Sequence, residues 1–181
     1  TNRTYTTSVK TGYRILSGFA RVNYDYNYRY MVSLVARYDG ISKLSDNRWG
    51  FFPGISAGWN VHEEAFFKDS KFAEVVSLIK PRISYGLNGN VNGIGNFDVY
   101  GKYGSVGAYN GNLGYLNTGV VNSKLRWEKS HTFELGLDLG FFNNRIHMSM
   151  DYYDHTTSDL LTDVNLPEYT GFPSFKTNLG T

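Results

Sequence analysis

The sequence predicts an all-β fold of long antiparallel strands, and three observations predict it. Aromatic residues make up 17% of the 181 residues, led by 15 Tyr, and Gly is abundant while Pro is scarce. This balance suits strands joined by turns. Six segments alternate apolar and polar residues with a period of two, as a strand with one apolar face does. No run of about 18 apolar residues exists, which excludes a transmembrane helix.

The first three alternating segments predict strands at 12–26, 29–38 and 50–61. Each has an apolar face and a face of polar, small or charged residues. The second segment shows the pattern over ten residues, with one face formed by Tyr30, Val32, Leu34, Ala36 and Tyr38. This length matches that of a tilted membrane-spanning strand better than the roughly 5–6 residues usual for strands of soluble sheets.

The last three segments predict strands at 78–88, 126–141 and 145–155, so that all six pair in sequence order. The fifth is the clearest, with an apolar face of Phe133, Leu135, Leu137, Leu139 and Phe141. Pro81 lies at the start of the fourth segment, where we expect it to shorten the strand, because proline cannot donate to a ladder. None of the six apolar faces carries a charged residue, and the opposite faces suit a water-filled lumen.

The connections alternate in length. Tight turns are expected near Asn27 and at Asn143-Asn144, whereas 40–49, 89–125 and the stretch after His155 are longer and lie on the other side. Short turns at one end and long loops at the other are typical of outer-membrane barrels. The connection 62–77 is long although it falls on the short-turn side. We expect a structured turn there, with a helical turn around 72–78.

Several function classes find no support in the residues. A formal net charge of +2 without a Lys/Arg run gives no footprint for nucleic acid, and the absence of cysteine removes thiol chemistry. No Gly-x-Ser-x-Gly elbow is present. Glu134 and Asp138 share a face, but a glycosidase needs its carboxylates in an enclosed cleft. The sequence predicts no enzyme.

Metal binding is not predicted either. His62, Glu63 and Glu64 are consecutive, so their side chains diverge and a third ligand is missing. A second set lies on one face at a spacing of four, which separates neighbours by roughly 13 Å on a strand, and consists of His147, Asp151 and His155. We interpret these three as polar groups that line a lumen. No cofactor is expected.

Several sequence motifs resemble those in the barrel of the SusC/RagA-type TonB-dependent outer-membrane transporters of Bacteroidetes. The matching stretches, in the order of that family, are LSGFARVNYDYNYRYMVSLVARYDG (16–40), NRWGFFPGISAGWNVHEEAFFKD (47–69), RISYGLNGN (82–90), LRWEKSHTFELGLDLGFFNNRIHMSMDYYDHTTSDLL (125–161) and LPEYTGF (166–172). Each alone is a weak signal, whereas together they are highly specific.

The resemblance implies an antiparallel transmembrane β-barrel segment, about six strands of a plugged barrel of about 22 strands. It implies residence in the outer membrane of a Gram-negative bacterium and import of large nutrients such as oligosaccharides or peptides. The implied partners are membrane lipid, a SusD-like surface lipoprotein that caps the barrel, and TonB. We expect 1–181 to be part of the barrel domain, with the plug domain, the TonB box and the closing strand absent from the chain.

Weak candidates for substrate contact are the aromatic residues of the long loops, since such side chains stack on sugars, namely Trp49, Tyr103, Tyr109 and Tyr115. The same residue types form interfacial belts and protein contacts. The stretch 89–125 is expected to touch either the lipoprotein or neighbouring loops of its own barrel. Two other functions remain open: a secreted β-sandwich that binds glycans or proteins, and a SusC-like barrel kept as a structural subunit of an outer-membrane complex.

Overall fold

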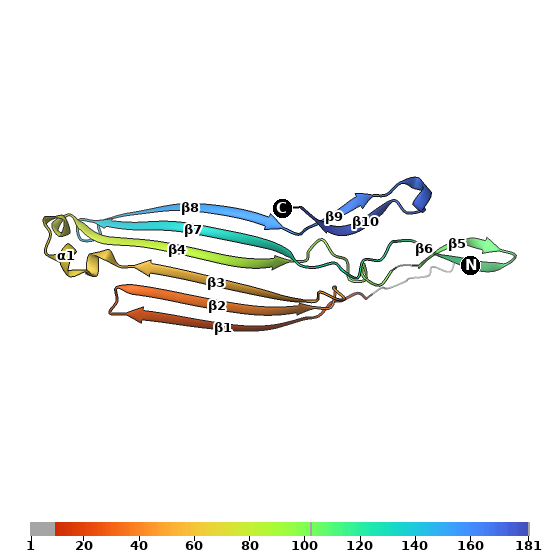
Figure 1. Cartoon of the computed structure of the whole chain (residues 1–181), viewed down its shortest axis with the longest axis horizontal. Coiled ribbons are helices and arrows are strands. Elements are labelled where there is room, and N and C mark those ends of the chain that lie inside the picture. The colour runs from red at the N-terminus through yellow and green to blue at the C-terminus, as the bar shows by residue number, and fades with distance from the viewer. Residues whose placement is uncertain (1–9, 102, 181) are drawn as a thin grey trace, which may run out of the picture.

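The computed structural model describes residues 10–101 and 103–180, with the side chains of Val106 and Tyr109 outside that description. Its main element is one antiparallel sheet in which neighbours follow the chain, in the order β1-β2-β3-β4-β7-β8 (Figure 1). The six strands are β1 (Ile15–Tyr26), β2 (Tyr30–Ile41), β3 (Trp49–Trp59), β4 (Val76–Asn90), β7 (Glu128–Phe141) and β8 (Ile146–Ser158). The six predicted strands and their pairing are confirmed, with shifts of a few residues at the ends.

Two tight turns close one end of this sheet, which we call the turn end. Asn27 and Tyr28 both have positive φ, at 51° and 57°, and Asp25 accepts a hydrogen bond from the Tyr28 N–H at 2.8 Å. Two consecutive left-handed residues match the right-handed twist of the strands that they join. The second turn likewise places Asn143 and Asn144 at positive φ, so both predicted turns are confirmed. The opposite end is the loop end.

Two prolines bracket the ladder between β3 and β4. That ladder holds only five pairs, from Gly54↔Gly86 to Gly58↔Arg82. Pro53 directly precedes Gly54 on β3, and Pro81 directly precedes Arg82 on β4. The ladder between β4 and β7 continues past Pro81, which pairs with Leu137. The expectation that Pro81 shortens the fourth strand is therefore wrong. The missing N–H limits one of the two ladders instead, and the strand runs on to Val76.

The connection between β3 and β4 is helical, as expected, but in a different place. It contains η1 (Val61–Glu63), α1 (Ala65–Lys68) and η2 (Lys71–Glu74), whereas β4 already begins at Val76. The helical turn predicted for 72–78 therefore ends earlier, because the residues from Val76 onward pair with β7. We call residues 60–75 the connector.

The long loops contain regular structure that the alternation did not predict. A hairpin of β5 (Tyr103–Tyr109) and β6 (Asn112–Asn117) projects past the sheet, and a second hairpin pairs β9 (Leu160–Asn165) with β10 (Ser174–Leu179). Between β9 and β10 lies η3 (Glu168–Thr170). Figure 1 shows both hairpins at the loop end. Among the residues described, no helix is long and apolar enough to cross a membrane.

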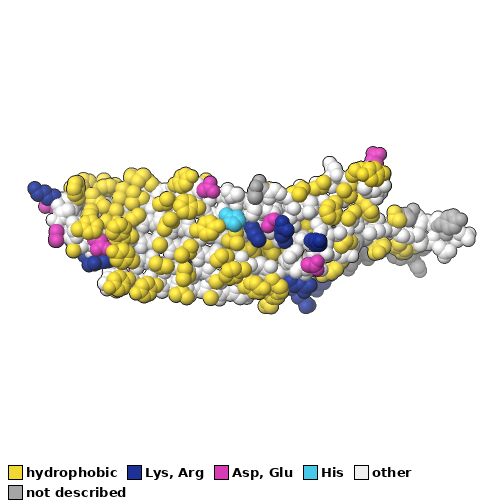
Figure 2. All heavy atoms as spheres, viewed as in Figure 1, with side chains coloured by type: hydrophobic (Ala, Val, Ile, Leu, Met, Phe, Trp, Pro, Cys, Tyr) yellow, Lys and Arg dark blue, Asp and Glu magenta, His cyan; other side chains and the backbone are white. Residues whose placement is uncertain are grey.

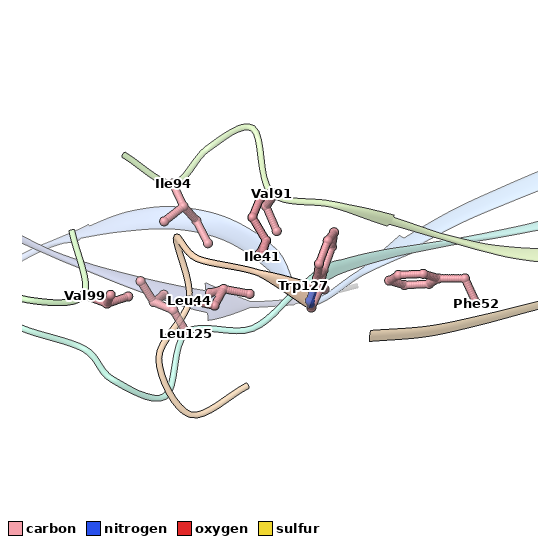
Figure 3. Packing of buried hydrophobic residues seen from close by; sticks show 8 residues of the cluster. All are labelled: Ile41, Leu44, Phe52, Val91, Ile94, Val99, Leu125 and Trp127. Carbon is pink, nitrogen blue, oxygen red and sulfur yellow. The ribbon is translucent and has the colours of Figure 1, made fainter. Parts of the chain in front are cut away.

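The buried hydrophobic residues gather at the loop end rather than under the sheet. This cluster, which we call the loop core, joins the start of the β2–β3 loop to the stretches on either side of the β5–β6 hairpin (Figure 3). Its members are Ile41, Leu44, Phe52, Val91, Ile94, Val99, Leu125 and Trp127. In the described part of the chain no second sheet covers either face of the six strands, so the β-sandwich alternative does not apply.

Candidate functional site

The apolar face of the six-stranded sheet is open to its surroundings. One side chain from each strand, all on this face, is between 46% and 61% exposed: Val22, Leu34, Ile55, Ile83, Leu135 and Met150. Figure 2 shows hydrophobic side chains spread as a band over these strands. An apolar surface of this extent is not stable against water, and it fits contact with lipid. We call it the outward face.

Aromatic residues mark both borders of the band. At the turn end the Tyr30 ring stacks between Tyr26 and Trp59, with centroids 6.4 and 6.2 Å away. At the loop end Tyr38 and Trp49 stack almost parallel, 5.1 Å apart. The indole of Trp49 covers Gly40, where a Cβ would lie 2.5 Å from the ring. Such aromatic belts occupy the two membrane–water interfaces of barrels.

The band crosses the strands obliquely, and this gives the tilt of the strands. Leu34 is the middle of the apolar run of β2. The row of paired residues that crosses the sheet from Leu34, perpendicular to the strands, ends at Asp154 on β8. The apolar run of β8 extends from Ile146 to Tyr152, so its centre is displaced by five residues from that row. Five residues are about 17 Å along the strands and four strand spacings are about 19 Å across them, which gives a tilt of about 40°. Membrane barrels have tilts of roughly 35–45°.

The tilt also fixes the height of the band. Tyr30 and Tyr38 lie eight residues apart on β2, about 27 Å along the strand and about 21 Å along the membrane normal. The apolar band of outer-membrane barrels is about 25 Å tall. The sheet thus has the length, tilt and polarity to span a bilayer.

A buried carboxylate supports the belt at the turn end. Glu64 accepts hydrogen bonds from the Tyr30 hydroxyl at 2.7 Å and the Trp59 indole N–H at 3.2 Å, and it pairs with Arg29. These donors, the Tyr30 hydroxyl first, hold the pKa of Glu64 below its ordinary value. Sequence reasoning considered Glu64 only as a metal ligand. Its role depends on the connector folding back onto the belt, which no local pattern indicates.

The opposite face of the sheet is polar and carries an ion network. Arg82 contacts the carboxylates of Glu134 at 2.9 Å, Asp138 at 3.3 Å and Asp151 at 2.5 Å. Gly136 leaves room for this guanidinium, since a Cβ there would lie 2.6 Å from it. A hollow of about 530 Å³ adjoins the network, lined by small and polar residues such as Ser33, Ser56 and Gly58. This face suits a water-filled lumen.

The carboxylates of the polar face that were considered for catalysis or metal binding share one partner, Arg82. Glu134 and Asp138 both bind Arg82. Asp151 joins the same arginine, whereas His155 contacts the Thr132 hydroxyl at 2.9 Å. Nowhere in the described residues do three His, Cys, Asp or Glu side chains form a group that could hold a metal ion.

The loop core holds the stretch 89–125 against its neighbours. Phe52 fills the space where β3 and β4 separate, its ring edge-on to Trp127 at 5.3 Å and below the Arg37 guanidinium. The Trp127 indole donates to the Arg48 carbonyl at 3.1 Å, and Asn47 donates to the Lys124 carbonyl. The prediction that 89–125 touches neighbouring loops of its own chain is confirmed for its two packed ends.

The candidate substrate-contact residues separate into two places. Trp49 lies on the outward face beside Tyr38. Tyr103 and Tyr115 lie on one face of the β5–β6 hairpin, because Tyr115 pairs with Ser105, which follows Tyr103 by two positions on the same strand. They are 75% and 67% exposed. The backbone of Tyr109 belongs to β5, and its side chain lies outside the described part.

A tilted sheet with one lipid-facing side, one polar side and belts at both borders defines a segment of a transmembrane β-barrel wall. Comparison with known proteins agrees. The family model "TonB dependent receptor-like, beta-barrel" matches residues 1–181. TonB-dependent receptor P39 of Formosa agariphila is 37% identical over 172 residues, covering 94% of this chain and 16% of the relative. TonB-dependent receptor SusC of Bacteroides thetaiotaomicron is 37% identical over 184 residues, covering 97% and 18%.

Solved structures give the same result. The RagAB peptide transporter matches with a TM-score of 0.82 and 31% identity, over 93% of this chain and 18% of that one. The open-open state of the RagAB peptide importer matches with a TM-score of 0.84. The chain belongs to the TonB-dependent receptor β-barrel family and is a barrel segment of its SusC/RagA kind. It spans less than a fifth of the length of these relatives.

Proposed function

We propose that the parent protein of this barrel segment imports large nutrients, such as oligosaccharides or peptides, across the outer membrane of a Gram-negative bacterium with energy from TonB. The observation that carries this proposal is the joint similarity to SusC and to a peptide transporter, at 37% and 31% identity. The loop end is then extracellular and the turn end periplasmic, because barrels of this type keep long loops outside. The polar face with its Arg82 network lines the lumen.

The test is uptake by cells that carry the parent gene. Labelled peptides and labelled oligosaccharides of matched size are offered to the parent strain, to a deletion strain and to a strain without TonB. We expect one substrate class to enter only when both the parent protein and TonB are present. Equal uptake in all three strains would contradict import. An assembled surface complex without such uptake would favour the structural-subunit function instead.

We also propose that the β5–β6 hairpin contacts a SusD-like lipoprotein or the substrate at the barrel mouth. An isolated two-stranded hairpin is only marginally stable in water, so a partner is the simplest reason for its length. Aromatic side chains flanked by Gly and Asn residues suit both protein and glycan contacts. Tyr103 and Tyr115 are the proposed contact residues, since they share one exposed face. Trp49 faces outward and is left out of this proposal.

Replacing 103–117 by a short Gly-Ser linker tests this role while retaining the loop core on both sides. We expect the lipoprotein to co-purify less well, with normal heat-modifiable migration of the barrel. The paired substitutions Tyr103→Ser and Tyr115→Ser should produce a smaller loss of the same kind, whereas Tyr28→Ser at the turn end serves as the control. Unchanged recovery of the lipoprotein together with unchanged uptake would rule out the hairpin as a contact surface.

A further inference from the structure

The connector exposes large apolar side chains at the turn end of the sheet. Phe66 and Phe72 are 64% and 74% exposed, although they lie in a segment of short helices held by backbone hydrogen bonds. Val75 is also exposed. None of these residues lines the hollow on the polar face. We propose that the connector is a membrane anchor whose Phe66 and Phe72 insert into the phospholipid leaflet on the periplasmic side. This inference rests on the proposed placement of the sheet in the outer membrane.

The first argument is position. Glu64, which directly precedes α1, binds the Tyr30 hydroxyl and the Trp59 indole. Both rings belong to the aromatic belt on the outward face, so this carboxylate holds the start of α1 at the height of the membrane interface. The bond at 2.7 Å and the buried state of Glu64 make the attachment specific.

The second argument is rigidity. The far end of the connector is fixed as well, because the Phe142 N–H donates to the Val75 carbonyl at 2.8 Å. Between the two attachments, the Ser70 hydroxyl donates to the Phe67 carbonyl and the Ala73 N–H to the Ser70 carbonyl. A connector held at both ends keeps its apolar side chains close to the turn end of the sheet.

The third argument is the chemistry of the exposed surface. The connector carries two lysines, Lys68 and Lys71, and four acidic residues, Glu63, Glu64, Asp69 and Glu74. Glu63 pairs with Lys68 and Glu64 pairs with Arg29, so ion pairs offset part of the negative charge. Apolar tips among charged groups are typical of segments that lie at a lipid interface. The small net charge that remains after these ion pairs fits a zwitterionic leaflet better than a strongly charged protein surface.

The fourth argument is continuity with the lipid-facing band. Figure 2 shows hydrophobic side chains extending from the strands to the end of the molecule where Figure 1 places α1, with charged side chains at the extreme edge. A phospholipid leaflet that covers the band up to the belt of Tyr30 and Trp59 meets the connector at its border. The same lipid is therefore the occupant that the geometry favours.

Spin labelling of the full-length parent protein in phosphatidylethanolamine-containing vesicles tests the anchor. The chain has no cysteine of its own, so Phe66→Cys and Phe72→Cys each give one nitroxide here once cysteines elsewhere in the parent are replaced. Met150→Cys on the outward face is the lipid reference, and Asn110→Cys in the turn of the β5–β6 hairpin is the water reference. The measured quantity is the ratio of oxygen accessibility to accessibility for a water-soluble nickel complex.

We expect the ratio at Phe66→Cys and Phe72→Cys to approach that at Met150→Cys and to exceed that at Asn110→Cys severalfold. Adding Glu64→Ala should raise the mobility of the Phe66→Cys label and lower its ratio. A ratio equal to the water reference would overturn the anchor, and so would an immobile label shielded from both reagents, which indicates a protein partner. If Met150→Cys itself resembles Asn110→Cys, the membrane placement fails, and the anchor fails with it.

Discussion

Leu137→Arg tests the assignment of the outward face at its most sensitive position. Leu137 is the centre of the apolar run of β7, which extends from Phe133 to Phe141, and its row neighbours are Pro81 and Met150. With the strand tilt of about 40°, this position lies close to the middle of the bilayer. An arginine there has no water to solvate its charge. We expect a loss of folding free energy of about 2–4 kcal/mol.

That loss corresponds to about a 30- to 700-fold change in the folding equilibrium. The assay is refolding of the full-length parent from denaturant into lipid vesicles, followed by heat-modifiable migration and by fluorescence. Leu135→Arg provides a graded comparison, because it lies two residues toward the loop end, about 5 Å higher along the membrane normal. Its cost should be smaller, since the penalty falls toward the interface.

Ser149→Arg is the matched control on the polar face. The Ser149 hydroxyl donates to Asp138 at 2.6 Å, so an arginine at this position faces a carboxylate and the aqueous lumen. It should lack the solvation cost of Leu137→Arg. If Leu137→Arg refolds into lipid as well as Ser149→Arg does, the two faces have been assigned the wrong way round.

Three further predictions follow from individual side chains. Trp127→Ala should cost about 3–5 kcal/mol and loosen the loops at the loop end, because it removes a buried ring from the loop core; amide hydrogen exchange of 89–101 that stays as slow as before would contradict this. Acid should weaken the attachment of Glu64 to Tyr30: its lowered pKa means that the carboxylate stabilises the fold at neutral pH, and this is lost as the pH falls below the ordinary glutamate value of about 4.3. Unfolding midpoints against pH should show this for the parent and not for Glu64→Gln. Arg82→Met and Asp151→Asn should couple by about 0.5–1 kcal/mol in a double-mutant cycle, since both groups are more than a third exposed; additive effects would refute the ion pair.

The strands could be predicted from sequence because lipid imposes a simple rule on them. Every second residue of β7 from Phe133 to Phe141 lies on the outward face, so the alternation is unbroken over the run and visible without any knowledge of the neighbouring strands. In a soluble sheet, tertiary packing often overrides such a pattern. The same alternation predicted which residues of each strand share a face. The structure pairs the six strands in the expected order.

The β5–β6 hairpin shows a signal that was present and was missed. Asn110 and Gly111 both have positive φ, at 49° and 78°, and an Asn-Gly pair between short alternating runs indicates a two-residue hairpin turn. The abundance of Gly and Asn across 89–125 concealed it. The pairing of β9 with β10 leaves a weaker trace, because eight residues separate these strands and no tight turn joins them.

The loop core could not be read from the sequence, because its members are scattered and obey no period. Ile41 is the last residue of β2, whereas Val91 and Leu125 lie on either side of the β5–β6 hairpin. Each looks like an isolated apolar residue in a polar stretch. These residues are buried because they lie at the loop end, beyond the lipid-facing band. In a barrel wall, lipid covers the apolar side chains of the strands. Beyond the belt of Tyr38 and Trp49 the surroundings are aqueous, so the apolar side chains of the loops are removed from water only by packing against one another. The only fully buried cluster among the described residues therefore begins where the lipid-facing band ends, and it fixes the base from which the β5–β6 hairpin projects.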